Sequence, residues 1–363
     1  MQNRQIIEPK RSIDVIHETD VLVVGSGPGG LSAAIASARC GVKTTLLERF
    51  GCFGGNITVV GVEGFAWYRH EKTVEAGGIG REFEELAKEM GAAVPESQSL
   101  SYELDSEGFK LVADKLVMDS GIHPMLHRSF SMPIMEGNTI IGVIVESKAG
   151  REAILSKVVI DATGDADVAF RAGAQLNTMP VEELMATSVM FHLAGVDKKA
   201  FLSEIQNNPQ SYKDWSDSEW EVETDGKEDD LFSPFIKKPF QQAINDGLLP
   251  SDLKTIGGTW GAVHDTGELT YMNIIQLSNI DGTNPDDLTR GEIEGRKQAM
   301  LAIEALKKYY PGCEKARLRN FGMSIGIRDT RKLDAVYNMT AVSYTHLRAH
   351  ETEADLVCRL LLE

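Results

Sequence analysis

Three glycines and one glutamate near the start of the chain have the types and spacing that hold a dinucleotide. Gly25, Gly27 and Gly30 follow the apolar run Val21–Val24. Gly25 permits a tight turn from strand into helix, Gly27 lets the backbone approach a pyrophosphate, and Gly30 lets the helix pack closely on the sheet. Glu48 closes the next apolar run, where a carboxylate accepts both hydroxyls of a ribose. An acid there disfavours a 2′-phosphate, so the motif predicts FAD or NAD in preference to NADP.

A second segment, far along the chain, has a similar placement. Thr163-Gly164-Asp165 follows the apolar run Val158–Ile160. It puts a small, flexible turn at the carboxyl end of a strand, where ligands bind in open parallel sheets. The same tripeptide is also a common turn, so by itself it leaves structure and function equally open. Together the two segments predict the two halves of one nucleotide site.

The elements that must position these motifs follow from the hydrophobic periodicity. Strands are expected at Val21–Val24 and Thr44–Leu47, on either side of a helix of small residues. Apolar positions at helical spacing predict helices at Thr73–Met90 and Phe109–Ser120, with a loop or short turns at Ala92–Leu104 between them. These helices form an insertion between the two nucleotide-binding segments.

The segments on either side of the second motif carry sequence signals for a hairpin, two strands and a long helix. Gly137-Asn138 turns a predicted hairpin that leads into the second motif. Ser188–Leu193 and Thr270–Leu277 are predicted strands, and Thr289-Arg-Gly-Glu292 offers a capping box for a helix that reaches about Lys308.

The sequence therefore predicts an α/β fold in two domains. The first is a Rossmann-like FAD-binding domain, a parallel sheet flanked by helices with a β-meander or hairpin, and the second is an α+β substrate domain. The expected ranges are 1–175 for the FAD-binding domain with a helical insertion at about 61–120, 176–321 for the substrate or cap domain, 322–341 for the start of a return to the FAD domain, and 342–363 for an adapter-derived artefact.

Composition excludes several classes of function. The chain of 363 residues has a formal charge of -17, so its field repels polyanions and argues against a nucleic-acid partner. No stretch approaches the roughly 20 apolar residues that span a bilayer, and we expect a cytoplasmic protein with no membrane partner. The acidic run Asp214–Asp230 is predicted to be a solvated loop. Neither the four cysteines nor the histidine pair His123 and His127 have the spacing of a metal site.

The paired motifs resemble those of FAD-dependent oxidoreductases with a glutathione-reductase-type nucleotide domain. Over most of residues 18–340 the chain is similar to a group related to the flavin part of heterodisulfide reductase and, more distantly, to succinate dehydrogenase and fumarate reductase flavoproteins. The similarity also includes Glu48–Asn56, Ile280–Arg290, Tyr310–Gly312 and Ile325–Arg331. It implies that FAD is the cofactor.

The resemblance also implies where the cofactor lies. The glycine turn would face the pyrophosphate, Glu48 the adenosine ribose and Asp165 the diphosphate or ribityl chain, with Ser129 and Phe130 as looser main-chain contacts to adenine. The expected cofactor-binding residues are Gly25, Ser26, Gly27, Pro28, Gly29, Gly30, Glu48, Arg49, Gly54, Gly55, Asn56, Thr163, Gly164 and Asp165.

One departure from the family concerns the end of the chain. Family members return near their C-terminus with another glycine-rich FAD segment, and nothing before Ala341 matches it. Residues 342–363 instead resemble a translated sequencing adapter. We therefore expect a C-terminally truncated chain that binds FAD weakly or not at all, so that the fragment would be inactive.

Two arginines are the candidate catalytic residues. Arg328 and Arg331 can hold an anionic substrate or the flavin, because guanidinium groups bind carboxylates through two parallel hydrogen bonds. Arginines on a helix surface are commoner, however, and leave a structural interpretation open. Further candidates for a base or a hydrogen-bonding group are His264, His192, Tyr271 and Asn273.

These observations predict an FAD-dependent oxidoreductase that transfers hydride or electrons between a small-molecule substrate and bound FAD. The alternative is a non-catalytic flavin- or NAD-binding electron-transfer subunit, with the donor site on a redox partner protein. A tRNA-modifying flavoprotein is a less favoured alternative, because it needs a basic surface.

Overall fold

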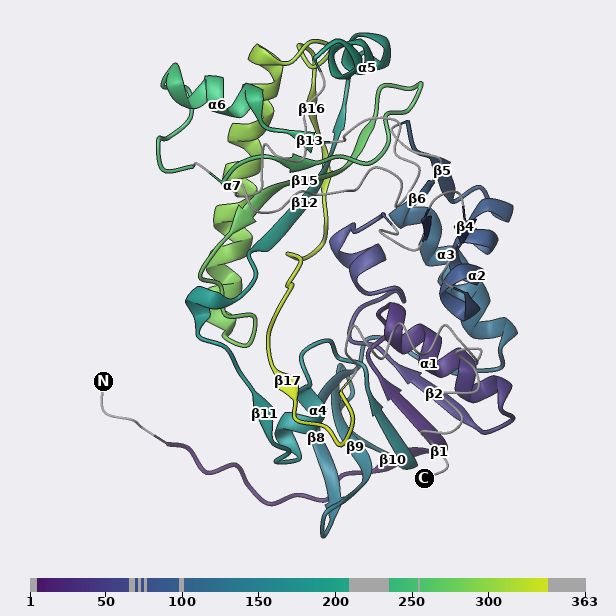
Figure 1. The fold of residues 1–363 in the computed structure, drawn as a ribbon. Helices are drawn as coiled ribbons and strands as arrows, with labels where there is room; N and C mark the ends of the chain where they lie inside the picture. The colour runs from purple at the N-terminus through teal and green to yellow at the C-terminus, as the bar shows by residue number, and fades with distance from the viewer. Residues whose placement is uncertain are drawn as a thin grey trace.

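The computed structural model describes residues 5–64, 69–70, 73–74, 77–97, 101–208, 235–253 and 255–338. The fold is a mixed α/β fold with a six-stranded sheet in the lower part of Figure 1 and a five-stranded sheet in the upper part. The predicted α/β class is confirmed. The domain boundaries stay predictions, and the artefact assigned to 342–363 and the acidic run Asp214–Asp230 lie outside the described residues.

The six-stranded sheet contains both glycine motifs. Its strands are β1 (Val15–Val24), β2 (Thr44–Leu47), β7 (His123–Met125), β8 (Ser129–Glu136), β9 (Thr139–Ser147) and β10 (Gly150–Asp161). The order is β7-β2-β1-β10-β9-β8, in which the first four are parallel and the last three form an antiparallel meander. Val24 lies opposite Asp161 in the parallel pair of β1 and β10. Both motifs therefore start at the same edge of the sheet.

Three helices cover one face of this sheet, α1 (Pro28–Arg39), α2 (Gly78–Glu89) and α3 (Ser106–Asp119). The alternation of β1 separates two cores, because Val21 and Val23 pack with the helices whereas Leu22 and Val24 pack with the meander strands on the other face. The carboxylate of Asp105 caps α3 by accepting a hydrogen bond from the N–H of Gly108.

One predicted helix in the insertion begins too early. The segment Thr73–Met90 was expected to be helical throughout, but α2 starts only at Gly78, because Gly77 is extended and interrupts the helix. Thr73–Val74 instead forms β4, which pairs with β3 (Arg69–His70).

The loop expected at Ala92–Leu104 is also wrong. This segment contains β5 (Ala93–Pro95) and β6 (Tyr102–Leu104), an antiparallel pair. The tertiary contacts of Glu103 extend this pairing, since Glu103 also forms an isolated bridge with Gly64. The hairpin predicted at Gly137-Asn138 is confirmed and connects β8 to β9.

The five-stranded sheet is antiparallel, in the order β13-β14-β15-β12-β16. Its strands are β12 (Thr187–Ala194), β13 (Phe235–Ile236), β14 (Gly258–Thr259), β15 (Leu269–Leu277) and β16 (Arg317–Phe321). Its helices are α5 (Lys198–Asn207), α6 (Lys238–Asn245) and α7 (Pro285–Tyr309). The strands predicted from Ser188–Leu193 and Thr270–Leu277 are confirmed.

The long helix α7 lies along this second sheet. Its N-cap is Asn284, whose side chain accepts from the N–H of Asp286, so the capping box predicted at Thr289 is wrong. The Thr289 hydroxyl instead donates to the carbonyl of Pro285 within the helix. Close packing explains the glycine at 295, where a Cβ would lie 2.1 Å from Val189 Cγ2.

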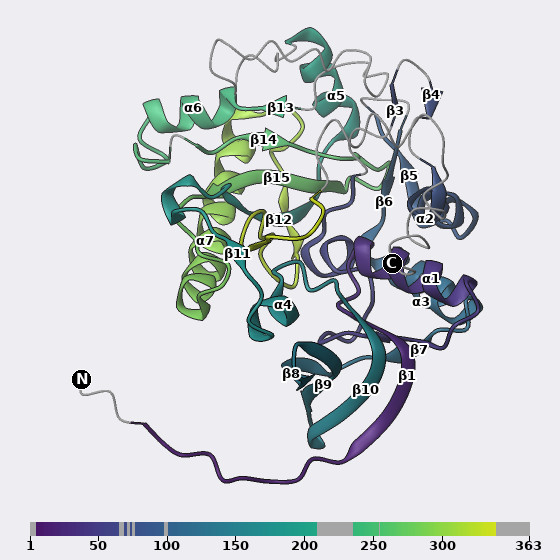
Figure 2. The same ribbon diagram turned by 60° about the horizontal axis from the view of Figure 1, so that its bottom comes forward.

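Short elements connect the two sheets. They are the π-helix η1 (Asn56–Val60), α4 (Asp167–Arg171), β11 (Leu176–Asn177), the 3-10 helix η2 (Val181–Glu183) and β17 (Lys332–Leu333). β17 pairs with β11 and returns the chain to the region of the second motif, as Figures 1 and 2 both show. None of the helices in the described part of the chain is long and apolar enough to cross a membrane.

Candidate nucleotide-binding site

The glycine turn between β1 and α1 has a packed inner side and an open outer side. Gly25 has a φ of 99°, and a Cβ there would lie 2.3 Å from the carbonyl oxygen of Ala162. At Gly30 a Cβ would lie 2.0 Å from the carbonyl oxygen of Gly25. Gly27 and Gly29, in contrast, have no atom within 4 Å of the position of a Cβ. The turn is therefore tightly seated on the second motif and leaves its outer surface accessible to a ligand.

The N-terminus of α1 lies at this open surface. Pro28 occupies the first helical position, and the helix has neither a side-chain cap nor an acidic residue in its first turn. The first intrahelical bond runs from the N–H of Leu31 to the carbonyl of Gly27 at 2.9 Å. Unpaired amides and the helix dipole at such an end favour an anion.

Glu48 is buried and already holds three donors. Its Oε2 accepts from the N–H and the hydroxyl of Ser26 at 3.0 and 2.6 Å, and its Oε1 accepts from the N–H of Phe50 at 2.9 Å. A carboxylate has about four acceptor sites, so one remains. The prediction that Glu48 accepts both ribose hydroxyls stays a prediction, and the geometry leaves room for one such bond.

The loop at Gly54-Gly55 lies directly on the glycine turn. The N–H of Gly54 donates to the carbonyl of Ser26 at 2.9 Å, and a Cβ at Gly55 would lie 2.6 Å from Gly27 Cα. Both glycines have positive φ, 114° and 52°. Asn56 then begins η1, so the structure brings this predicted trio beside the first motif.

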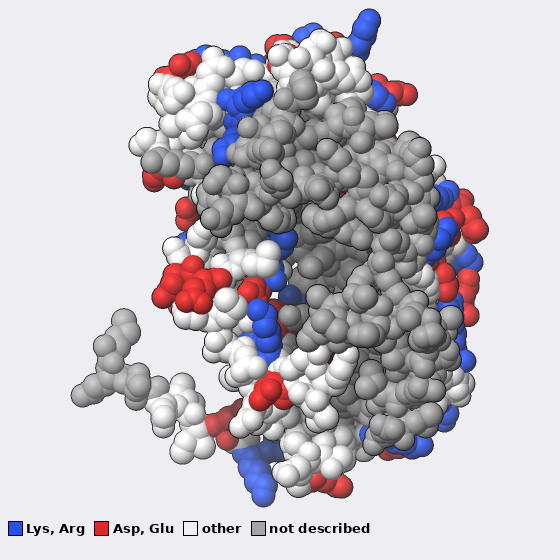
Figure 3. Space-filling view, viewed as in Figure 1, with Lys and Arg blue, Asp and Glu red and all other residues white. Residues whose placement is uncertain are grey.

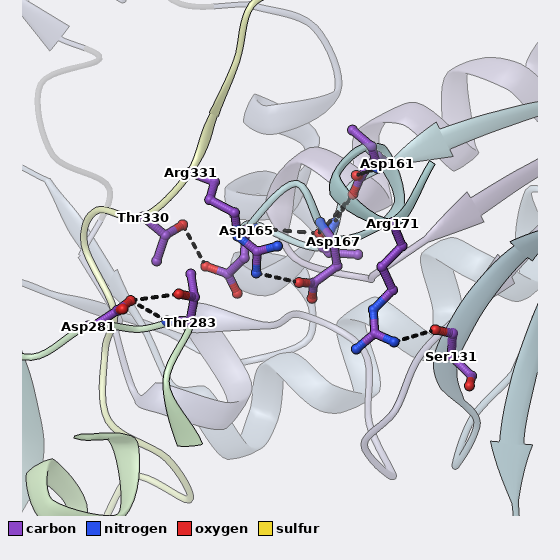
Figure 4. A network of polar contacts seen from close by, with 11 residues as sticks. Ser131, Asp161, Asp165, Asp167, Arg171, Asp281, Thr283, Thr330 and Arg331 are labelled. Carbon is purple, nitrogen blue, oxygen red and sulfur yellow. Dashed lines mark hydrogen bonds and ion pairs between the residues drawn. The ribbon is translucent and has the colours of Figure 1, made fainter. Parts of the chain in front are cut away.

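The second motif is a rigid turn held by Asp161. One oxygen of Asp161 accepts from the hydroxyl of Thr163 at 2.7 Å, and the other accepts from the N–H of Ala169 at 3.0 Å. Thr163 in turn accepts from the N–H of Asp167 at 3.0 Å. These bonds hold Gly164 at a φ of 86° and direct the following acids toward the returning chain (Figure 4).

Asp165 lies between the second motif and the segment that precedes β17. The hydroxyl of Thr330 donates to its Oδ1 at 2.9 Å. Burial raises the pKa of Asp165, and the bond from Thr330 and the charges of Arg49 and Arg331 act in the opposite direction. Two guanidinium groups therefore lie close enough to influence this carboxyl. Their positive charges also favour binding of an anionic ligand group beside Asp165.

Arg331 has donors to spare. Its Nη2 donates to Oδ1 of Asp167 at 2.8 Å, and its guanidinium stacks over the ring of Phe170 at 4.4 Å from the centroid. Its side chain is only 12% exposed, yet its Nε and Nη1 have no hydrogen-bond partner among the described residues. Such buried donors are costly unless a ligand or water accepts from them.

A cavity of about 180 Å³ lies at this junction. It is lined by Gly164, Asp165, Ile327, Arg328, Asp329, Thr330, Arg331 and Lys332. Ligand sites for whole cofactors span roughly 300–1,000 Å³, so the cavity is large enough for a part of a dinucleotide. The open glycine turn, the uncapped helix end and the unpaired donors of Arg331 fit the phosphate groups of FAD.

The remaining candidates differ in whether they line the cavity. Arg328 is exposed and lines it. His192 is 3% exposed, does not line it and contacts Glu63. Tyr271 has a strained φ of 50°. The N–H of His264 donates to the carbonyl of Glu268.

Three further predicted contact residues, Asn273, Ser129 and Phe130, lie on strands. Asn273 pairs with Thr259 in the five-stranded sheet, and Ser129 and Phe130 begin β8 at the edge of the six-stranded sheet. Sequence reasoning did not identify Thr330, because a threonine in a polar segment has no signal of its own.

A family model matches nearly the whole chain. Residues 20–360 match the family model described as FAD dependent oxidoreductase. Among curated proteins, the thiamine thiazole synthase of Metallosphaera sedula is 33% identical over 160 residues, which are 41% of this chain and 55% of that protein. A thiamine thiazole synthase of Saccharolobus islandicus is 33% identical over 162 residues, 42% of this chain and 57% of that protein. The chain thus spans about half the length of these curated relatives.

Solved structures match the chain at low sequence identity. CabE, an aromatic hydroxylase from angucycline biosynthesis, has a TM-score of 0.50 and 13% identity, over 88% of this chain and 54% of CabE. A geranylgeranyl bacteriochlorophyll reductase-like protein from Thermoplasma acidophilum has a TM-score of 0.47 and 16% identity, over 85% of this chain and 66% of that protein. The similarity to CabE indicates a common fold and nothing about the substrate.

Proposed function

Because the chain belongs to the FAD dependent oxidoreductase family, we propose that it binds FAD at the junction of its two motifs and oxidises or reduces a small molecule there. The observation that carries this proposal is the direct contact of the motifs. A Cβ at Gly25 would lie 2.3 Å from the carbonyl oxygen of Ala162, next to Thr163. The carboxyl ends of β1 and β10 therefore offer a single ligand position, as is usual for doubly wound sheets.

Each part of the site has a distinct task in this proposal. The turn at Gly25–Gly30 and the N-terminus of α1 hold the pyrophosphate through backbone amides and the helix dipole. Glu48 accepts one hydroxyl of the adenosine ribose through its remaining acceptor site. Arg331 donates through Nε and Nη1 to a second anionic group, which is a phosphate oxygen or the substrate.

The chemistry itself comes from the cofactor, since a bound flavin accepts a hydride or single electrons. Arg328, exposed at the cavity, orients an anionic substrate in this proposal. The substrate is a small molecule of unassigned identity, and a redox partner protein is a second proposed partner. The cytoplasmic location stays a prediction from the sequence.

The first test is the visible spectrum of protein purified from a gene in which native codons replace those after Ala341, with the released cofactor identified by chromatography. We expect a two-banded flavin spectrum and FAD. A colourless protein that FAD cannot reconstitute would overturn the proposal and make NAD the better candidate.

Anaerobic bleaching then separates the two classes of function. Reduction of the bound flavin by a small-molecule donor is expected for an enzyme. Reduction only in the presence of a protein partner would identify an electron-transfer subunit, and salt-sensitive binding of RNA would favour the tRNA-modifying alternative.

A further inference from the structure

A buried acid pair lies between the insertion and the second sheet, outside the cavity. Glu63 follows η1, and Glu103 lies in β6. Both side chains are about 2% exposed, the N–H of Leu104 donates to the carbonyl of Glu63 at 2.9 Å, and the two carboxyls lie close enough for each to raise or lower the pKa of the other. His192 of β12, 3% exposed, contacts the pair through its Nε2, which lies 3.3 Å from Oε2 of Glu63. Two buried carboxyls in contact cannot both be ionised, so they share a proton.

The hydrogen bonds identify which carboxyl is ionised. Glu63 accepts from the N–H of Ser106 at 2.9 Å and faces His192. Glu103 accepts from the hydroxyl of Thr270 at 3.0 Å, while its Oε1 has no other partner among the described residues. A proton on Glu103 that is donated to Glu63 satisfies both groups. Glu103 is therefore the acid and Glu63 the carboxylate.

Arg319 fixes the tautomer of His192. Its Nη1 lies 3.4 Å from Nδ1 of the imidazole, and arginine has only donors. Nδ1 must accept, so the ring proton is on Nε2, the nitrogen that faces Oε2 of Glu63. Burial, with the charge of Arg319, lowers the pKa of His192 to about 4 and keeps the ring neutral. Among the residues that the structure describes, no cation is in direct contact with the carboxylate of Glu63.

The lack of a side chain at Gly261 leaves space for the carboxyl of Glu103. A Cβ at Gly261 would lie 1.9 Å from Oε1 of Glu103. Replacing a buried ionic group by apolar residues is often neutral or stabilising, so packing alone gives no reason for an acid pair here. A group that must exchange a proton gives one.

The pair is also linked to the predicted cofactor loop. The N–H of Val62 donates to the carbonyl of Asn56 at 2.9 Å, and Glu63 is the next residue. Asn56 follows Gly54-Gly55, which lies against the glycine turn. One hydrogen bond and one peptide unit therefore separate Glu63 from a residue expected beside FAD.

We propose that the Glu63–Glu103 pair takes up one proton from solvent when the neighbouring FAD is reduced and returns it on reoxidation. This inference rests on the proposed function. Reduction of an FAD beside Asn56 would add negative charge near the pair, and negative charge favours protonation of a nearby carboxylate. The proton forms an O–H bond on Glu63 and no further reactant is needed. His192 acts as a positioning residue that holds Glu63 in place.

The electrostatic surroundings fit uptake near neutrality. Burial raises the pKa of Glu63 to about 7 and raises the pKa of Glu103 well above its usual value. The titratable and charged groups that act on the pair or on His192 are Glu96, Asp105, His264, Glu268, Tyr271 and Arg319.

The test is the pH dependence of the FAD midpoint potential in the full protein. One extra proton per two electrons changes the reduction equilibrium tenfold for each pH unit, which is about 30 mV for a two-electron couple. We expect this extra slope in the wild type above neutral pH and its loss in Glu63→Gln. Glu103→Gln, which mimics the protonated acid, and Glu107→Gln, an exposed control on α3, are expected to keep the slope. The same slope in Glu63→Gln as in the wild type would overturn the inference.

A second measurement needs no variant and covers the case in which Glu63→Gln does not fold. The infrared difference spectrum between reduced and oxidised wild type is expected to gain a protonated-carboxyl band. FAD-loaded protein without such a gain would overturn this inference and leave the proposed function intact. Protein that binds no FAD would overturn both.

Discussion

Thr330 donates its hydroxyl hydrogen to Oδ1 of Asp165 at 2.9 Å, and so joins the returning chain to the second motif. Thr330 is 9% exposed, which makes this bond part of the folded core of the site. The contact brings the two candidate arginines, Arg328 and Arg331, to the cavity at Gly164. The returning segment and the second motif therefore line one cavity.

Loss of this bond has a measurable cost. Thr330→Val keeps the shape of the side chain but removes the donor, and we expect about 1 kcal/mol less stability in urea unfolding. Thr289→Val is the matched control, because that hydroxyl is exposed on α7. Equal losses in the two variants would show that the Asp165 contact is energetically neutral.

Substitutions of Gly29 and Gly30, in the first turn of α1, are expected to have different effects on stability. Gly30→Ala places a Cβ 2.0 Å from the carbonyl oxygen of Gly25, so we expect a loss of about 1–3 kcal/mol. Gly29→Ala meets no atom within 4 Å and is expected to leave the unfolding free energy of the apoprotein unchanged or raise it by about 0.5–1 kcal/mol. Thermal unfolding of both variants without cofactor makes the comparison; a destabilised Gly29→Ala would contradict the open outer side.

Glu48 is expected to stabilise the fold before any cofactor binds. Glu48→Gln turns an acceptor toward Ser26 or Phe50 into a donor, which costs about 1–3 kcal/mol because the group is buried. Glu18→Gln, at an exposed position of β1, is the control. A Glu48→Gln apoprotein as stable as the wild type would indicate that the carboxylate serves the ligand alone.

Arg331 is expected to act through its fork of donors and not only through its charge. Arg331→Lys keeps the charge but loses the planar geometry, so we expect roughly tenfold weaker FAD binding, or a tenfold higher KM if the arginine contacts substrate. Arg171→Lys is the matched control, because Arg171 is bonded to the carbonyl of Ser131 away from the cavity. Titration of flavin fluorescence measures the affinity, and equal affinities in the two variants would exclude the ligand role.

The acid pair and His192 give opposite pH dependences. The pKa of Glu63 is raised from 4.5 to about 7, so the folded state retains a proton that the unfolded state loses, and stability falls as pH rises through this range. The pKa of His192 is lowered from 6.5 to about 4, so stability falls as pH drops through that range. In the pH range that the two pKa shifts share, the effects of Glu63 and His192 on stability have opposite signs.

His192→Gln removes one of the two effects and preserves a donor to Glu63. Between pH 4.5 and 6.5 we expect its unfolding free energy to fall more steeply with rising pH than that of the wild type, by about 1.4 kcal/mol per pH unit. Urea unfolding across this range measures the difference. Parallel curves for the two proteins would show that His192 does not change its protonation on unfolding.

The surface gives less information than the interior. On the face in Figure 3, the coloured lysine and arginine side chains alternate with aspartate and glutamate side chains and do not form one basic field.

The sequence alone determined the local units of this protein. The spacing of Gly25, Gly27 and Gly30 and the apolar runs around them specify a strand, a turn and a helix, because these choices depend on neighbouring residues. Gly137-Asn138 specified its hairpin for the same reason. Thr289 is not a cap and Thr73–Met90 is not one helix, because Asn284 and Gly77 are the N-caps of α7 and α2.

The tertiary structure decided which of these units meet. The contacts of Thr330 with Asp165, and of Glu63 with Glu103 and His192, join segments that no local pattern connects. Sequence periodicity reports which side of an element is buried, but the partner on that side depends on how the sheets and the returning chain pack. The two glycine motifs could therefore be identified from the sequence. The buried acid pair and the unpaired donors of Arg331 could be identified only from the folded chain.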